Sequence, residues 1–266
     1  MTLAEVGHTF TSDRGAVRAL DQIDLTVEPG EFVTLAGPSG CGKTTLLQIL
    51  AGFIAPTEGR VSVGADQVIG PDPGRGVVFQ QPNLFPWLSV RANAEFGPRM
   101  AGATRAERRE TSDRLLALVG LEGFADHRPY ELSGGMQQRA QIARVLATDP
   151  ALLLMDEPFG ALDALTRLRL QGQLRDLWLQ TGKTILFITH SVDEAAFLGS
   201  RVLVMSPRPG RVVLDEPSPY GRRTDLPAEP RSTPEFISFR DRVALAIHQG
   251  DALPESPDPG EVSAGP

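Results

Sequence analysis

The sequence predicts an α/β fold with a parallel core sheet, and three observations support that prediction. Residues 32–36 form a short apolar run that leads into a glycine-rich loop and then into helix formers. Residues 151–155 and 184–189 have the composition of parallel strands that are buried on both faces. The 266 residues, 41% of them hydrophobic, can bury a sizeable core as one large domain or as a domain with an inserted lobe.

The glycine-rich loop fits the phosphate-binding pattern G-x-x-x-x-G-K-[ST]. Its glycines permit a tight turn whose N–H groups face a polyphosphate, and the following helix adds the positive end of its dipole. Lys43 would reach the β- and γ-phosphates, and the Thr44 hydroxyl would hold Mg²⁺. The alternative is a glycine-rich turn with an incidental lysine, but the strand-to-helix setting disfavours it. The loop consists of Gly37, Pro38, Ser39, Gly40, Cys41, Gly42, Lys43, Thr44 and Thr45.

Composition narrows the class of protein. The formal net charge of −7 and the pI near 5.2 argue against a general nucleic-acid binder, which would need a basic face. Cys41 is the single cysteine, so a reducing compartment is expected; the residue either fills a variable loop position or acts as a redox switch. Because the first residues lack a signal-peptide pattern and no apolar run could span a bilayer, we expect a cytoplasmic chain.

The N-terminal part predicts an antiparallel β layer beside the core. Residues 20–27 alternate apolar and polar side chains, which is the period of a half-buried strand. Residues 2–10 and 61–63 supply further short strands. Phe10 is a candidate to stack on an adenine ring, and the alternative is an aromatic side chain in the core.

The next segments combine one helix, one strand and two less regular stretches. Residues 46–50 predict a buried helix, and residues 76–80 predict a strand that ends in the polar side chain of Gln80. Residues 82–90 hold large apolar side chains between prolines, so they either cap the core or form an exposed docking patch. Residues 102–128 form a charged, amphipathic helical region whose mixed signs suit a solvated face.

A serine and two glycines, Ser133, Gly134 and Gly135, open a helix that runs through Leu146. A serine N-cap with N–H groups at a helix start suits an anion, and an ordinary capped helix is the alternative. The acidic pair Asp156 and Glu157 follows the apolar run at 151–155, and ligands of open α/β sheets bind at the carboxyl ends of strands. We expect Asp156 to support Mg²⁺ through water, and Glu157 to orient and deprotonate an attacking water.

The part of the chain after residue 160 continues the alternation of helices and strands. A helix is expected after Asp163, and residues 184–189 form a strand that delivers His190. Ser191 and Glu194 have the spacing of a capping box that would start the next helix. Two late strands are expected at residues 201–206 and 211–214, and the acidic, proline-rich tail at 251–266 is expected to be disordered.

Together these motifs resemble those of ABC transporter ATPases. The resemblance covers roughly residues 3–215 and implies a phosphate-loop NTPase core with a parallel sheet, an antiparallel β subdomain and an inserted α-helical subdomain at about 88–148. Residues 216–250 would be a C-terminal extension. The most specific segment is residues 132–139, called the signature segment below. The motifs that carry the resemblance are the phosphate loop, the signature segment, Asp156-Glu157, Ala161-Leu162-Asp163 and Thr189-His190.

The resemblance implies roles for individual residues. Gln80 is similar to the glutamine that senses Mg²⁺ and the attacking water, and His190 to the histidine that contacts the γ-phosphate. Ser133 and Gly135 resemble the residues that close over the γ-phosphate of the other subunit, with Asp163 communicating across the dimer. Phe10 resembles the ring that stacks on adenine, although a tyrosine is commoner there. Met136 also departs from the usual glutamine, and neither departure removes a phosphate ligand.

The resemblance also implies partners. It predicts an ATP- and Mg²⁺-dependent homodimer, bound peripherally to membrane permease subunits at the cytoplasmic face of the inner membrane and served by an extracytoplasmic solute-binding protein. A finer resemblance, to importer ATPases for nitrate, sulfonate and taurine, rests on residues 84–90, 160–167, 189–195 and 207–211. The alternatives are a soluble ABC ATPase that acts on nucleic acid or ribosomes, and a phosphate-loop kinase or GTPase; the signature segment argues against the second.

Overall fold

A computed structural model describes residues 1–13, 15–224, 226 and 230–251. By compactness the chain separates into two units, which are described one at a time: Met1–Pro71 with Ile188–Pro266, and Asp72–Phe187. The domain limits expected from the sequence stay predictions. The tail expected to be disordered lies outside the described residues, apart from Asp251.

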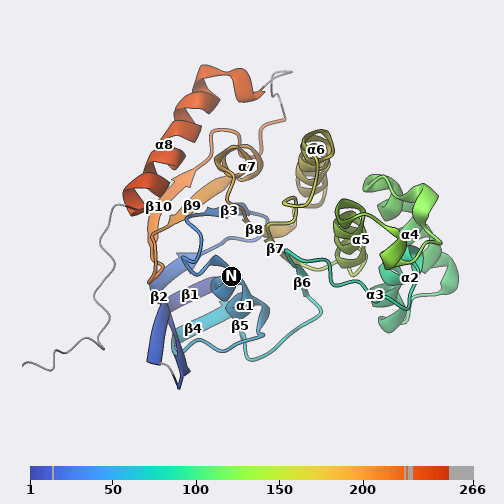
Figure 1. Cartoon of the computed structure of the whole chain (residues 1–266), viewed down its shortest axis with the longest axis horizontal. Helices are drawn as coiled ribbons and strands as arrows, with labels where there is room; N and C mark the ends of the chain where they lie inside the picture. Colours follow the sequence, from blue (N-terminus) through green and yellow to red (C-terminus); the bar gives the residue numbers. More distant parts are fainter. Residues whose placement is uncertain (14, 225, 227–229, 252–266) are drawn as a thin grey trace, which may run out of the picture. The chain divides into compact units, whose positions relative to one another are not determined.

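The first unit contains the antiparallel layer that the sequence predicts (Figure 1). Its strands are β1 (Thr2–Ser12), β2 (Gly15–Thr26), β4 (Glu58–Val63) and β5 (Asp66–Gln67). They lie in the order β2-β1-β4-β5, and each neighbouring pair is antiparallel. Leu3 pairs with Leu25 and Val6 with Ile23, and all four side chains are buried. The alternating pattern therefore places one face of this sheet in the core.

The same unit holds the strand that leads into the phosphate loop. β3 (Phe32–Ala36) is buried at every position and runs parallel to β9 (Arg201–Met205), which pairs antiparallel with β10 (Val212–Pro217). The helix α1 (Lys43–Ala51) follows the loop, and α7 (Val192–Leu198) packs on β3. A parallel strand followed at once by a glycine loop and a helix is the arrangement that the sequence predicts.

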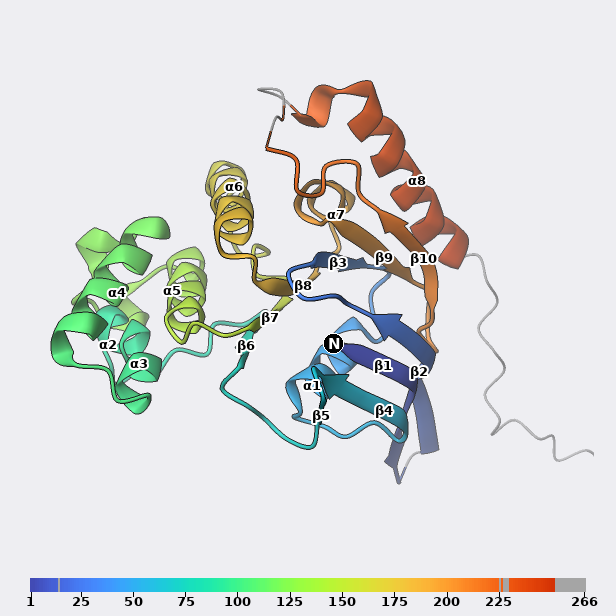
Figure 2. The ribbon, with the colours of Figure 1, turned by 180° about the vertical axis from the view of Figure 1, so that it is seen from behind.

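The C-terminal extension packs on this unit. It includes a short helix, η3 (Pro230–Ser232), and the long helix α8 (Pro234–Asp251), which contacts α7, β9 and β10 (Figures 1 and 2). Tyr220, Phe236 and Phe239 are fully buried in one apolar cluster with Val202 and Val204 of β9. The extension therefore contributes its own aromatic side chains to the core.

The second unit pairs a small parallel sheet with a group of helices. Its strands are β6 (Arg75–Val78), β7 (Leu152–Asp156) and β8 (Thr184–Ile188), which ends at the unit boundary. β6 and β7 are parallel, β7 lies between β6 and β8, and every residue of β7 is buried. The helices are α2 (Val90–Ala94), α3 (Phe96–Met100), α4 (Arg105–Leu118), η1 (Glu122–Phe124), η2 (Pro129–Glu131), α5 (Gly134–Leu146) and α6 (Ala164–Thr181).

Two helix starts differ from what the sequence predicts. At α7 the Ser191 side chain accepts from the Glu194 amide at 3.3 Å, but the Glu194 carboxylate accepts from the Thr189 hydroxyl instead of returning to Ser191. The predicted capping box is therefore half formed. A complete capping box, which was not predicted from the sequence, occurs at α4 between Thr104 and Glu107, residues with the spacing T-x-x-E.

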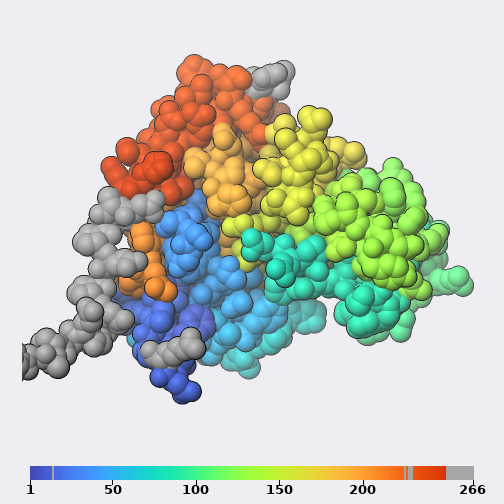
Figure 3. Space-filling view, viewed as in Figure 1, coloured from blue at the N-terminus to red at the C-terminus, as the bar shows by residue number. Residues whose placement is uncertain are grey.

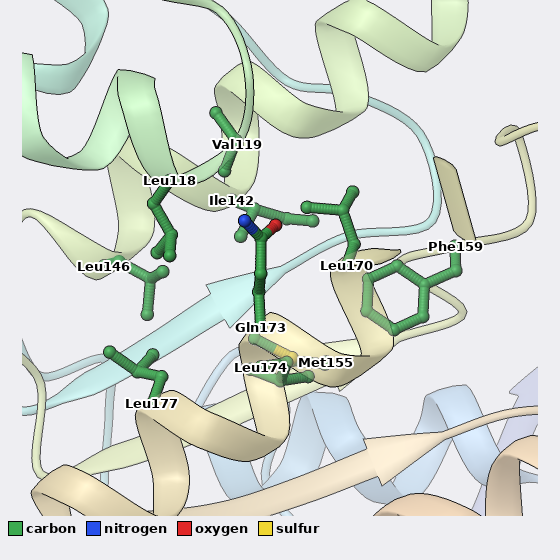
Figure 4. Close-up of a pocket in the computed structure, with 10 residues that line it drawn as sticks. All are labelled: Leu118, Val119, Ile142, Leu146, Met155, Phe159, Leu170, Gln173, Leu174 and Leu177. Carbon is green, nitrogen blue, oxygen red and sulfur yellow. The ribbon is translucent and has the colours of Figure 1, made fainter. Parts of the chain in front are cut away.

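An apolar cavity of about 20 Å³ lies within the second unit (Figure 4). Its lining comes from α4, α5, α6 and β7 and the residues beside them, and Figure 4 shows the Gln173 amide reaching in among the apolar side chains. Within the described part of the chain, Gln173 Oε1 is buried and has no hydrogen-bond partner. The lining residues are Leu118, Val119, Ile142, Leu146, Met155, Phe159, Leu170, Gln173, Leu174 and Leu177.

Candidate functional site

The phosphate loop depends on glycine where its backbone turns into α1. Gly42 has φ +100°, and a Cβ there would come 2.7 Å from Leu20 Cδ2 and 2.9 Å from the Ala19 carbonyl oxygen. Gly42 is also the N-cap of α1, so this helix starts without a side-chain cap and without an acidic residue in its first turn. An uncapped helix start with a positive dipole end favours an anion.

Lys43 places its ammonium inside the same loop. Its Nζ donates to the Gly37 carbonyl at 2.8 Å and the Pro38 carbonyl at 2.7 Å, and contacts Cys41 Sγ at 3.6 Å. The residue is buried, so the carbonyls compensate part of the cost of removing the charge from water. The loop therefore holds a positive charge among its own peptide groups, and the contact of Lys43 with the β- and γ-phosphates stays a prediction.

Cys41 behaves as a structural thiol. It is fully buried, and burial raises the pKa of its thiol, an effect that the nearby Lys43 ammonium opposes. Because the thiolate is the reactive form, a raised pKa disfavours the redox switch and favours the interpretation of Cys41 as a residue that fills the loop.

Phe10 and His190 also belong to the first unit. Phe10 is 45% exposed, with its ring edge-on to His8 at a centroid distance of 4.5 Å, so the alternative of a core aromatic is wrong. His190 is exposed and follows Thr189, whose amide donates to the Leu35 carbonyl of β3 at 3.2 Å. The backbone just before His190 is thereby fixed to the strand that leads into the phosphate loop.

The second unit brings Gln80 and Glu157 together. Gln80 Nε2 donates to Glu157 Oε2 at 3.2 Å. Asp156 is the last residue of β7 and is buried, whereas Glu157 has φ +45°, an uncommon conformation for a residue other than glycine. Such backbone strain often marks a functional site, because it aims a side chain that a regular strand would direct elsewhere.

The signature segment starts α5 with a side-chain cap. Ser133 Oγ accepts from the Met136 amide at 3.3 Å, and Ser133 and Gly134 are exposed at the helix start. A Cβ on Gly135 would come 3.2 Å from the Ala161 carbonyl oxygen, so glycine allows α5 to approach the segment before Asp163. Asp163 caps α6 by accepting from the Thr166 amide at 3.0 Å, and hydrogen bonds with Thr166 lower the pKa of its carboxyl group.

Sequence reasoning missed how α5 holds the residue before Gln80. Gln138 and Gln141 are fully buried, and both donate to the Phe79 carbonyl, at 3.0 and 2.7 Å. Gln141 also accepts from the Asn83 amide at 2.9 Å. Because α5 starts at the signature segment, its body links that segment to the backbone that carries Gln80. Two glutamines on the inner face of an apolar helix were the available signal.

The segment after Gln80 is an aromatic patch. Phe85 lies 5.6 Å from Trp87 and 4.6 Å from Phe96 between ring centroids, and the Arg144 guanidinium lies 5.1 Å from the centre of the Phe85 ring. Trp87 is 69% exposed, so the alternative that it caps the core is wrong. Asn93, fully buried, holds the patch by accepting from the Phe85 amide at 2.8 Å and donating to its carbonyl at 3.1 Å.

Among the described residues, no group of three or more histidine, cysteine, aspartate or glutamate side chains is arranged to hold a metal ion. Thr44 of the first unit has a hydroxyl oxygen and Asp156 of the second unit has a carboxylate oxygen, and each is a hard donor of the kind that Mg²⁺ accepts. That they support the same ion stays a prediction. Among the described helices, none combines the length and apolar composition needed to cross a bilayer.

Comparisons with known proteins agree with this arrangement. A family model described as ABC transporter matches residues 20–160. The taurine import ATP-binding protein of Ruegeria pomeroyi is 52% identical over 251 residues, which cover 93% of each chain. The protein of the same name from Roseobacter denitrificans is 51% identical over 87% of each chain. A dimeric post-hydrolysis structure of the ATP-binding cassette MJ0796, bound to ADP and Pi, has a TM-score of 0.74 and 35% identity, and covers 81% of this chain and 97% of that one.

Proposed function

Because this chain belongs to the ABC transporter family of ATP-binding proteins, we propose that it couples ATP hydrolysis to the import of a small anionic solute through a membrane permease. The main support for this proposal is the hydrogen bond from Gln80 to Glu157, beside the carboxyl end of β7. The same chain has a phosphate loop that leads into α1, a helix whose start has no side-chain cap. Such a glutamine–carboxylate pair suits the handling of an attacking water.

The site residues divide the chemistry as follows. The phosphate loop, Lys43 above all, holds the phosphates of ATP, with Phe10 stacked on adenine. Mg²⁺, carried by the hydroxyl of Thr44 and supported by Asp156, would neutralise phosphate charge. Glu157 accepts a proton from the attacking water that Gln80 helps to orient. His190 contacts the γ-phosphate.

Glu157→Gln tests this assignment directly. General-base assistance typically contributes about 10²- to 10⁴-fold, so kcat for ATP should fall by that factor while ATP binding is retained. Glu110→Gln, an exposed site on α4, is the control and should leave kcat unchanged. Near-normal turnover of purified Glu157→Gln protein would remove Glu157 from the role of base.

We also infer a homodimer in which Ser133 and Gly135 act on the ATP of the other subunit, with Asp163 communicating between the sites. The dimeric state of the similar cassette supports this proposal. In a mixed dimer of Lys43→Ala and Ser133→Arg subunits, both changes fall in one site and the other site stays intact. About half of the activity should therefore survive, and a wholly inactive mixed dimer would show that the signature segment does not act in trans.

The solute and the partners are further proposals. The names of the taurine import proteins at 51% and 52% identity support a sulfonate such as taurine, and nitrate is the other solute that the finer sequence resemblance implies. The permease would hold the chain at the cytoplasmic face of the inner membrane, and an extracytoplasmic binding protein would deliver the solute. Co-expression with each candidate permease, followed by assay of solute-stimulated ATPase with taurine, nitrate and sulfate, tests the choice. The acidic balance disfavours a non-transport role on nucleic acid or ribosomes.

We propose that the aromatic patch formed by the exposed Trp87 and the half-buried Phe85 binds the permease. Aromatic anchors are enriched at interfaces, and truncating one costs about 2 kcal/mol or more of binding. Trp87→Ala should keep basal ATPase and melting temperature but lose permease association. Tyr130→Ala, which removes another exposed ring of the same unit, is the control. A Trp87→Ala protein that binds permease normally would exclude this docking surface.

A further inference from the structure

Helix α7 is hydrogen-bonded to β3 on one side and to the C-terminal extension on the other. On one side, Thr34 Oγ1 of β3 donates to the Ala195 carbonyl at 3.0 Å. On the other, Ser218 Oγ donates to the Ala196 carbonyl at 3.3 Å, and Phe236 and Phe239 of α8 are buried in one cluster with both alanines. Figure 3 shows α8, in red, on the outer surface of this unit. Helix α7 is thus clamped between the strand that leads to the phosphate loop and the extension.

Arg231 of the extension contacts the same helix. Its guanidinium lies over the Phe197 ring, 4.3 Å from the centroid, which is a cation–π contact. Burial lowers the pKa of Arg231, and the carboxylates of Asp193 and Glu194 oppose that shift, so both acids of the first turn of α7 interact with this cation. Arginine stays charged at neutral pH, so the extension places a fixed positive charge against α7.

The first turn of α7 in turn fixes the backbone around His190. The Glu194 carboxylate, which is buried, accepts from the Thr189 hydroxyl. The same hydroxyl accepts from the Ser191 amide at 3.0 Å, and the Thr189 amide donates to Leu35 of β3 at 3.2 Å. The residues before and after His190 are therefore both held, and Glu194 is the link from α7 to that turn.

We propose that the C-terminal extension, through Arg231 and the aromatic face of α8, positions His190 by holding α7. Arg231 is a positioning residue, not a catalytic one, because its guanidinium lies over the Phe197 ring of α7 and the carboxylates of Asp193 and Glu194 act on its charge. The role rests on the proposed function, in which His190 contacts the γ-phosphate. A histidine on a less rigid turn would still allow ATP to bind to the phosphate loop but would reach the γ-phosphate less often in the correct geometry.

The test compares Arg231→Ala with Arg242→Ala in the full chain. Both changes remove a guanidinium from a phenylalanine ring, but Arg242 stacks on Phe239 within α8 at 5.4 Å and bonds to Glu216 of β10 at 2.6 Å. Arg231→Ala should lower kcat for ATP by about tenfold to 10²-fold, as misplacement of a reacting group does, and change KM by less than about twofold. Amide hydrogen exchange at residues 192–198 should increase. Arg242→Ala should change neither, and Arg231→Lys should restore much of kcat.

Two further variants keep the result interpretable. Phe197→Leu removes the ring but keeps an apolar side chain, so it should reproduce the loss of kcat even if Arg231→Ala folds poorly. His190→Ala separates this inference from the proposed function. If His190→Ala retains normal kcat, the proposed role of His190 is wrong. If His190→Ala loses kcat while Arg231→Ala and Phe197→Leu match Arg242→Ala in kcat and exchange, the positioning role of the extension is wrong.

Discussion

The starts of α1 and α5 are built in opposite ways, although each is proposed to contact ATP: α1 contacts the ATP of its own subunit, and α5 contacts the ATP of the other subunit. Helix α1 begins at Gly42, which has no side chain to offer, and its charge comes from Lys43, held by loop carbonyls. Helix α5 begins at Ser133, whose oxygen already accepts from the Met136 amide. A helix start without a side-chain cap leaves its N–H groups available to bind phosphate whenever nucleotide is present. A helix start with a side-chain cap is stable without a ligand, so it suits a contact that forms and breaks in each hydrolysis cycle.

A side chain that caps the start of α1 should have the largest effect on ATP affinity. Gly42→Asp gives α1 a carboxylate where phosphate is expected, and two like charges at about 4 Å with an effective dielectric of about 20 repel by about 4 kcal/mol, or roughly 10³-fold in ATP affinity. Nucleotide titration by fluorescence measures the loss. Gly42→Asn, whose side chain would meet the same Leu20 and Ala19 atoms without the negative charge, controls for the clash and for backbone strain. Equal ATP affinity in the two variants would contradict the assignment of phosphate to the start of α1.

Removing the side-chain cap of α5 should have the next largest effect, and this effect should be on kcat. Ser133→Ala removes a cap, which costs about 1 kcal/mol of stability, and a hydrogen bond to a charged phosphate, worth about 1.5–3 kcal/mol or roughly 10- to 150-fold in kcat. Ser89→Ala removes the equivalent cap of α2, where the Ser89 side chain accepts from the Ala92 amide at 3.1 Å. The two proteins should lose similar stability, and ATPase assays should separate them. Equal kcat would reduce Ser133 to an ordinary cap.

A smaller effect is expected from the body of α5. Gln141→Met keeps the length of the side chain but removes its bonds to the Phe79 carbonyl and the Asn83 amide. Neutral hydrogen bonds contribute about 0.5–1.5 kcal/mol, so kcat should fall about 2- to 10-fold with unchanged ATP affinity. Gln180→Met, at an exposed position of α6, is the control. Unchanged kcat in Gln141→Met would mean that α5 does not position Gln80.

The smallest effect is expected from the residues that pack against the buried faces of α1 and α5, and it should be on stability. The buried face of α1 is apolar apart from Lys43, whereas α5 backs onto the cavity that contains the Gln173 oxygen. Gln173→Met should remove a buried, unsatisfied acceptor and stabilise the protein by about 1 kcal/mol, raising the melting temperature by about 2–4 °C without a change in kcat. A lower melting temperature would show that the Gln173 amide is compensated in solution.

The raised pKa of the Cys41 thiol predicts how the free energy of unfolding depends on pH. A thiol whose pKa is raised on folding contributes stability that is fully present below its unfolded pKa, near 9.0, and is lost as the pH rises through the folded pKa. Unfolding free energy measured between pH 7 and pH 10 should therefore fall more steeply above pH 9 in the wild type than in Cys41→Ala. If the unfolding free energies of the wild type and of Cys41→Ala fall equally with pH, the pKa of the Cys41 thiol is not raised by folding.

The sequence predicted these sites to different degrees, and the reason is physical. The phosphate loop, the serine cap of α5 and the acidic pair after β7 are local, because each depends on residues a few positions apart. The bond from Gln141 to the Phe79 carbonyl joins residues 62 positions apart, so no local pattern contains it. The capping box at Ser191 was wrong in half for a related reason, since the Thr189 hydroxyl competes for Glu194. Exposure of Trp87 depends on tertiary packing, which left both alternatives open in the sequence.

The buried aromatic face of α8 has a consequence for protein synthesis. Until residues 234–243 leave the ribosome, the surface of β9 and α7 that Phe236, Phe239 and Val243 will cover stays open to solvent. A nascent or proteolysed chain that ends near residue 215 would display this apolar surface to its neighbours, and such surfaces promote aggregation. Chaperone binding should therefore persist until α8 (Pro234–Asp251) has docked, so this helix controls when the chain can be released without aggregating.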